Sequence, residues 1–165
     1  MAKVKWKLAA GKTWKKKLEQ DHPSHGKILP IPTRMQKRFG KGTMLIPKPL
    51  DVDAVMRKVR KGRLITQSQI RDALAKQSKA DHACPLTTGI FVRIAAEAAE
   101  EDHQAGKKRI TPYWRTIKDN GGLNEKFPGG AKTQAAKLRK EGFTIQPSKG
   151  KQPPKVKDFE KHLIK

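Results

Sequence analysis

Three stretches with helical periodicity, joined by short links, lie between residues 51 and 102 and restrict this chain to a mainly helical core. The first stretch has apolar residues three and four positions apart, at Val52, Val55, Met56 and Val59. This spacing predicts a helix with one buried stripe. Asp51 or Asp53 is placed to cap its start, and Gly62 to end it.

The next two stretches predict a pair of helices joined by a turn. Thr66 and Gln69 have the spacing of a capping box, which predicts a helix from there to about Gln77. After a turn at 79–85, a third helix is expected to begin near Leu86 or Thr87, with one face lined by Leu86, Ile90, Ile94 and Ala98. A short turn between two such helices is typical of a helix-turn-helix.

Residues 110–146 predict a small β component. Residues 110–118 read as a strand, residues 119–122 as a tight turn, and residues 123–130 as the return strand of a wing. A fourth helix over 131–140 is expected to stop at Gly142, and 143–146 to pair with a strand within 155–164. The expected fold class is α+β and mainly α: a winged-helix-like helix-turn-helix domain with a small β-hairpin, preceded by a basic extended arm.

The charge of the chain specifies the kind of partner. The 165 residues include 38 Lys and Arg but only 15 Asp and Glu, which gives a formal net charge of +23. Such an excess favours polyanions, above all the phosphates of nucleic acid. No apolar run is long enough to span a bilayer and Met1–Leu18 lacks an apolar signal region. We therefore expect a cytoplasmic, nucleoid-associated protein, a monomer without membrane contact.

The basic segment 1–49 is expected to be an extended arm because prolines recur through it and disfavour a compact fold. Only 34–39 is expected to form a helical turn. The arm is either a solvated tail or a strand lying on phosphates, with Trp6 and Trp14 stacking on bases. The expected division of the chain is this arm, a domain over 50–146 and a basic tail over 147–165.

Four short motifs in order along the chain support a family resemblance. They are Lys61-Gly62-Arg63-Leu64-Ile65, Pro112-Tyr113-Trp114-Arg115, Phe127-Pro128-Gly129-Gly130 and Leu138-Arg139-Lys140-Glu141-Gly142. Residues 55–142 thereby resemble the DNA-binding domain of the alkylguanine-DNA alkyltransferases and the alkyltransferase-like proteins. The resemblance implies that residues 112–115 correspond to the family's Pro-Cys-His-Arg motif. Residues 127–130 then correspond to its Tyr-Ser-Gly-Gly loop. The resemblance also implies recognition of a flipped, alkylated guanine.

The departures from that family pattern argue against catalysis. Tyr113 stands at the position of the family's alkyl-accepting cysteine, and Trp114 at that of the histidine base. A phenol without an adjacent base is a poor acceptor. Cys84, the single cysteine, is a less favoured alternative acceptor with only His82 nearby. Neither a metal site nor a cofactor is expected. The family's base-displacing arginine and the tyrosine near Gln67 are also missing, which argues against base flipping.

The residues expected to bind nucleic acid lie at helix starts and in basic loops. Helix amides favour phosphate and hydroxyls bond to phosphates or base edges, unless they only cap the helix. The candidates are Gln67, Ser68, Thr87, Thr88, Gly89, Arg93, Lys107, Lys108, Arg109 and Lys126, with Lys118 on the same rim. The resemblance adds base-pocket candidates at Pro112, Tyr113, Trp114, Arg115, Phe127 and Gly129.

The sequence therefore predicts a non-catalytic nucleic-acid-binding protein similar to the alkyltransferase-like DNA-repair proteins. DNA is the favoured partner, RNA is an alternative, and the resemblance allows a repair-protein partner. The competing hypothesis is a sequence-independent DNA or RNA binder, associated with the nucleoid or the ribosome, that uses the same fold.

Overall fold

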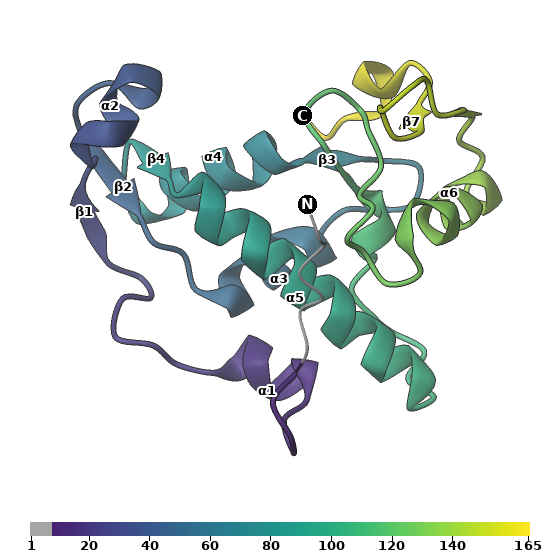
Figure 1. Ribbon diagram of the computed structural model, residues 1–165, viewed down its shortest axis with the longest axis horizontal. Helices are drawn as coiled ribbons and strands as arrows, with labels where there is room; N and C mark the ends of the chain where they lie inside the picture. Colours follow the sequence, from purple (N-terminus) through teal and green to yellow (C-terminus); the bar gives the residue numbers. More distant parts are fainter. Residues whose placement is uncertain (1–7) are drawn as a thin grey trace.

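The computed structural model describes residues 8–165, which form a mainly helical domain with three small sheets (Figure 1). In chain order the elements are α1 (Trp14–Glu19), β1 (Ile28–Pro30), α2 (Thr33–Phe39), β2 (Thr43–Leu45), α3 (Pro49–Arg57), β3 (Ile65–Thr66), α4 (Gln67–Ser78), β4 (His82–Ala83), α5 (Pro85–Gln104), η1 (Tyr113–Arg115), β5 (Thr116–Ile117), α6 (Gly130–Lys140), β6 (Ile145–Gln146), β7 (Lys155–Val156) and η2 (Phe159–His162).

The predicted stripe of α3 is confirmed, since Val52, Val55 and Met56 are buried against α4 and α5. Its predicted start is wrong. Pro49 occupies the first turn, where its fixed φ and missing amide are favourable, so the helix begins ahead of both aspartates. Asp53 is instead buried, accepting hydrogen bonds from Thr111 Oγ1 at 2.6 Å and Arg57 Nε at 2.9 Å.

Helix α4 begins with the predicted capping box. The Thr66 hydroxyl accepts from the Gln69 amide, and the Gln69 side chain accepts from the Thr66 amide. Gln69 Nε2 also donates to the Ile164 carbonyl at 2.9 Å, and Leu64 forms a parallel bridge with Leu163. The chain after η2 is therefore joined to the start of α4. Strand β3 pairs in parallel with β5 beside it.

Helix α5 runs diagonally through the middle of the molecule in Figure 1. Ile94 and Ala98 are buried as expected, but Leu86 is 68% exposed, so its predicted inward orientation is wrong. The side chain of Thr88 lies on the buried face of the first turn instead. Because two residues span more than half a helical turn, Leu86 faces away from that side.

The expectation of an extended N-terminal arm is wrong for the part that the structure describes. Helix α1 packs on α5, and β2 pairs with β1 on one side and with β4 on the other. Ile31, Met44 and Leu45 are buried. The predicted helical turn at 34–39 is confirmed as α2. We call residues 22–48 the N-terminal lobe. Lys3, Lys5, Trp6 and Lys7 of the predicted arm lie outside the described residues.

The predicted strand over 110–118 and its return strand are also wrong. The Tyr113 amide donates to the Thr111 carbonyl at 2.8 Å, closing a γ-turn at Pro112 that leads into η1. The side chain of Gln134 on α6 then makes the bonds that a strand ladder would make. It accepts from the Asn124 amide at 2.8 Å and donates to the carbonyls of Trp114 and Thr116. Only β5, two residues long, remains extended there.

The C-terminal third otherwise follows expectation. Helix α6 buries Ala135 and Leu138 and ends before Gly142, which has a φ of 96°. Strands β6 and β7 form the predicted terminal hairpin, with Ile145 opposite Val156. Figure 1 shows α6 and β7 at the opposite end of the molecule from α2 and β1.

Candidate nucleic-acid interface

A groove of about 430 Å³ lies where the start of α5 faces the start of α4 and the loop after β5. The loop supplies Lys118 and residues 124–126, and α4 supplies Gln67. The full lining is Gln67, Pro85, Leu86, Gly89, Ile90, Arg93, Lys118, Asn124, Glu125 and Lys126. Four residues predicted to bind nucleic acid, Gln67, Gly89, Arg93 and Lys126, are thus brought together, with Lys118 beside them.

The charge of this lining is predominantly positive. Arg93, Lys118 and Lys126 contribute three cations against the carboxylate of Glu125. Glu97, one turn further along α5, has a carboxylate oxygen 4.0 Å from Arg93 Nε. Burial raises the pKa of Glu97, and the Arg93 guanidinium opposes that shift. The groove therefore favours anions, while Glu97 offsets part of the Arg93 charge.

The start of α4 offers less to a phosphate than the sequence predicts. The Ser68 amide donates to Asp119 Oδ1 at 2.9 Å, and the Ser68 hydroxyl donates to Asp119 Oδ2 at 2.6 Å. Arg71 donates to the same hydroxyl at 2.9 Å. A carboxylate of the chain thus occupies the position at this helix start that an anion favours. Gln67, outside this cluster, remains in the groove lining.

The start of α5 presents its backbone through Gly89. Thr87 donates from Oγ1 to Cys84 Sγ at 3.2 Å, and the Thr88 side chain is buried. Gly89 lies in the lining, and a Cβ at this position would lie 3.8 Å from Gln67 Oε1. Of the three small residues predicted there, Gly89 alone lines the groove.

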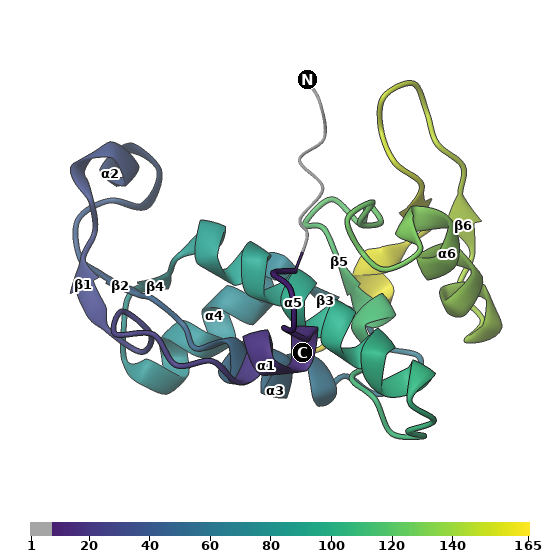
Figure 2. The same cartoon turned by 60° about the horizontal axis from the view of Figure 1, so that its bottom comes forward.

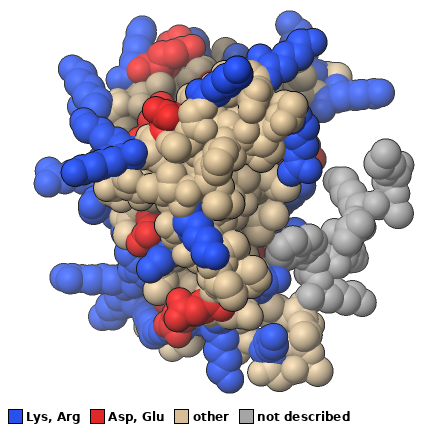
Figure 3. Space-filling view, turned by 90° about the vertical axis from the view of Figure 1, so that its left-hand side faces the viewer, with Lys and Arg blue, Asp and Glu red and all other residues tan. Residues whose placement is uncertain are grey.

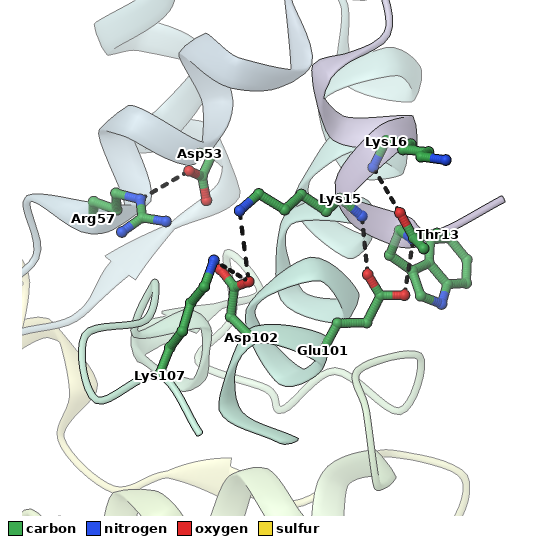
Figure 4. A network of polar contacts seen from close by, with 9 residues as sticks. Thr13, Lys15, Lys16, Asp53, Arg57, Glu101, Asp102 and Lys107 are labelled. Atoms are coloured by element: carbon green, nitrogen blue, oxygen red, sulfur yellow. Dashed lines mark hydrogen bonds and ion pairs between the residues drawn. The ribbon is translucent and has the colours of Figure 1, made fainter. Parts of the chain in front are cut away.

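The loop at 107–109 lies on the other side of α5. Lys107 and Arg109 line a second cavity of about 380 Å³ together with Ala95 and Ala99. Ala99 follows Ile90 by nine residues, which is two and a half helical turns, so the two face opposite directions. In Figure 4, Lys15 and Lys107 converge on Asp102, at 3.9 and 3.0 Å. Lys108 is in the same loop.

Helix α1 is capped by a side chain from the end of α5. Glu101 accepts hydrogen bonds from the amides of Trp14 and Lys15 at 2.9 and 3.0 Å (Figure 4). A carboxylate at this position stabilises the first turn of a short basic helix. Trp14, predicted to be a stacking residue, is part-buried against the core.

The aromatic residues predicted to line a base pocket belong to the core instead. Tyr113 is fully buried, donates to Glu100 Oε2 at 3.1 Å, and packs edge-on against Trp114 and Phe127. Burial raises the pKa of Tyr113, and the Glu100 carboxylate adds to the shift. Pro112 and Phe127 are buried too. The structure brings none of these residues into the groove lining.

Comparison with solved structures places this arrangement in a known architecture. No protein-family model and no curated protein matches the chain. A crystal structure of S. pombe Atl1, in complex with damaged DNA containing O6-carboxymethylguanine, superposes with a TM-score of 0.51 at 17% sequence identity. The match covers 71% of this chain and 94% of that chain. This chain has the alkyltransferase-like fold. The expected α+β, mainly helical class with a helix-turn-helix is confirmed.

Within the alkyltransferase-like fold, Arg115 and Glu141 form a part-buried ion pair, with side chains 14% and 9% exposed. Arg115 Nε lies 2.9 and 3.1 Å from the two Glu141 oxygens, and its terminal nitrogens reach Glu141 Oε1 and the Val59 carbonyl. The pair links η1 to the end of α6 and the end of α3. Trp114 lies next to it, with Lys137 Nζ 5.0 Å from the ring centre. Arg115 and Glu141 thus hold η1, α3 and α6 together rather than line the groove.

Gly129 holds the loop before α6 in a conformation that requires glycine. Its φ is 75°, and a Cβ there would lie 2.2 Å from Thr133 Oγ1. The loop can therefore turn into α6 only with glycine at this position. Gly129 thus sets the backbone conformation of this loop and does not line the groove.

Five groove residues were missed from the sequence: Pro85, Leu86, Ile90, Asn124 and Glu125. Periodicity places Leu86 on the buried face, but it does not determine which residues of the first helical turn point inward. Asn124 is oriented by its Oδ1, which accepts from the Lys126 amide at 2.9 Å. The Asn124-x-Lys126 spacing is typical of an Asx turn and could have indicated an ordered loop.

The described residues contain no cluster of three or more His, Cys, Asp and Glu placed to hold a metal ion. Within the same residues, no helix is both long and apolar enough to cross a membrane. The thiol of Cys84 is buried at the start of α5 and bonded to Thr87.

Proposed function

We propose that this chain is a non-catalytic DNA-binding protein that holds duplex DNA against the groove between the start of α5 and residues 118–126. The observation that supports it most directly is the cationic groove at the helix-turn-helix. Arg93, Lys118 and Lys126 come from two separate parts of the chain and face one space. Phosphate contacts from such residues supply most of the affinity of DNA-binding proteins. The solved neighbour with this fold is bound to damaged DNA.

The state of the two candidate acceptors supports the absence of alkyl transfer. The Tyr113 phenol is fully buried, donates a hydrogen bond to Glu100, and has a raised pKa. A phenol held neutral in this way is a poor nucleophile. Cys84 is buried too, and its sulfur accepts a hydrogen bond from Thr87. Neither atom lines the groove.

Recognition of a single base is the finer form of the proposal. A volume of about 430 Å³ is within the range of small-ligand pockets. Gln67 and Asn124 bring side-chain amides to its lining, and amides can pair with the edges of bases. Leu86 and Ile90 supply apolar surface for the face of a base.

The sequence-independent alternative is favoured by one observation: among residues 8–165, no aromatic ring belongs to the groove lining. Proteins that hold an extrahelical or single-stranded base commonly stack it on such a ring. Under this alternative, the groove and the basic surface bind a duplex or a folded RNA through phosphates alone.

A competition titration at fixed salt separates these functions. A labelled duplex with one alkylated guanine is competed by the unmodified duplex, single-stranded DNA and structured RNA. Stronger competition by duplex DNA than by RNA supports the proposal, and preference for the modified duplex supports base recognition. Equal competition by RNA favours the alternative. The variant R93Q/K118Q/K126Q should weaken duplex binding, and unchanged binding would contradict the use of the groove.

A further inference from the structure

The N-terminal lobe, residues 22–48, carries cations without any carboxylate. Its cations are Lys27, Arg34, Lys37, Arg38, Lys41 and Lys48, and all six are exposed. Among the residues that the structure describes, none of the six forms an ion pair. The carboxylate that reaches the lobe from outside, Asp81, accepts from the amide and hydroxyl of Thr43. The lobe thus presents uncompensated positive charge.

Helix α2 sorts its residues by face. Arg34, Lys37 and Arg38 are spaced three and four apart and share one side of the helix. Met35 and Phe39 lie on the other side, where they pack on a buried cluster of Ile31, Met44 and Cys84. Like charges at this spacing repel each other. A bound polyanion would relieve that repulsion.

The lobe is fixed in position at the edge of the groove. Strand β2 pairs with β4, and the Cys84 amide donates to the Leu45 carbonyl at 2.9 Å. Cys84 belongs to the lobe's apolar cluster and directly precedes Pro85 and Leu86, which line the groove. A tail that served only solubility would not need this packing.

The lobe and the groove also face the same way. In both Figure 1 and Figure 2, α2 and the loop that follows β5 lie above α5, and α1 lies below it. Figure 3 views the lobe end of the molecule, where Lys and Arg side chains project mainly from the rim and outnumber the Asp and Glu side chains between them. A duplex resting on the groove would therefore pass the lobe if it continued beyond the start of α5.

We infer that the N-terminal lobe is a second phosphate-binding surface, which extends the contact with a duplex beyond the groove. The inference rests on the proposed function and adds a separate prediction. The lobe contributes only when the DNA is long enough to reach it. Its contribution is ionic, so it is measured by the salt dependence of binding.

The test compares two variants of the full chain that each remove two arginines and two lysines. The lobe variant is R34Q/K37Q/R38Q/K41Q. The control variant is K58Q/R60Q/K61Q/R63Q, whose residues are all exposed and directly follow α3. Helix α3 lines the second cavity, on the far side of α5 from the groove. Circular dichroism checks that both variants fold.

Binding is measured by fluorescence anisotropy over a series of salt concentrations, with duplexes of about 10 and about 20 base pairs, one and two helical turns. Each lost phosphate contact lowers the slope of log affinity against log salt by about 0.9. On the long duplex the lobe variant should lose roughly two to four units of slope, and on the short duplex almost none. The control variant should match the unmodified chain on both.

Failure of this inference is distinguishable from failure of the proposed function. If the lobe variant keeps the full slope on the long duplex, or if both variants lose the same slope, the lobe is not a specific contact. The groove variant R93Q/K118Q/K126Q decides the proposed function separately, since it should weaken binding to both duplexes.

Discussion

Replacing both Arg115 and Glu141 should destabilise the chain by much less than the sum of the two single replacements. The side chains are 14% and 9% exposed, and two Arg115 nitrogens contact the Glu141 carboxylate. The variants are R115M, E141M and R115M/E141M. Each single change leaves one charge in a largely dry position without its partner, whereas the double change removes both charges.

The expected magnitudes follow from these contacts. Loss of one partner of a buried ion pair costs about 3–5 kcal/mol. We expect about 3 kcal/mol for E141M, because Arg115 keeps its bond to the Val59 carbonyl at 2.6 Å. R115M also leaves that carbonyl unsatisfied, which raises its cost to about 4 kcal/mol. The double variant should cost about 2–3 kcal/mol rather than the sum of about 7.

The assay is urea denaturation followed by circular dichroism, which gives the free energy of unfolding of each variant. Thermal unfolding should agree, since about 3 kcal/mol corresponds to roughly 6–12 °C in a chain of this size. If either single variant loses less than about 1 kcal/mol, or if the two losses simply add, the pair does not act as a unit. The assignment of Glu141 as a structural residue would then be wrong.

Three further predictions test the site and its surroundings. Tyr113 is the single tyrosine, and burial raises its pKa, so absorbance at 295 nm should show no phenolate until the protein unfolds. Since only the unfolded chain loses this proton above a pH of about 10, stability should fall there by up to about 1.4 kcal/mol per pH unit; an early, reversible titration would refute this. E97Q removes the carboxylate 4.0 Å from Arg93 and should strengthen DNA binding about two- to fivefold, as anisotropy would measure; weaker binding would contradict the proposed role of Arg93. L86S should change the free energy of unfolding by less than about 0.5 kcal/mol, because Leu86 is 68% exposed, yet lower DNA affinity; equal affinity would remove Leu86 from the interface.

The helices could be predicted from the sequence because their signals are local. The stripe of α3 and the capping box of α4 each lie within a few residues. The N-terminal lobe could not be predicted, because β2 is ordered by pairing with β4, with Leu45 opposite Ala83. The recurring prolines predict an extended chain, whereas Pro32 and Pro49 stand at the starts of α2 and α3, where proline is compatible with a folded chain. The predicted wing is wrong for a different reason. The side chain of Gln134 makes hydrogen bonds that the backbone of a strand pair was expected to make.

The groove was only partly predictable. Gln67 lies at the start of α4, and Gly89 and Arg93 lie in the first part of α5. A helix-turn-helix brings these two helix starts close together, so their shared place in the groove is predictable. Charge alone predicts that the basic loop at 107–109 belongs to the same surface. Its real position depends on the length and rotational phase of α5, which carries it to the other face. Tyr113 and Phe127 were assigned to a pocket by resemblance, but burial places them in the core.

The link between the start of α4 and the chain after η2 has a consequence for the order of folding. Gln69 is bonded to Ile164, and Leu64 is paired with Leu163, about a hundred residues further along. Contacts between such distant residues form late, because a long loop must close first. The wall of the groove at Gln67 therefore becomes rigid only in the last steps of folding. A ribosome-bound chain that already contains α4 and α5 would still have an unfinished groove.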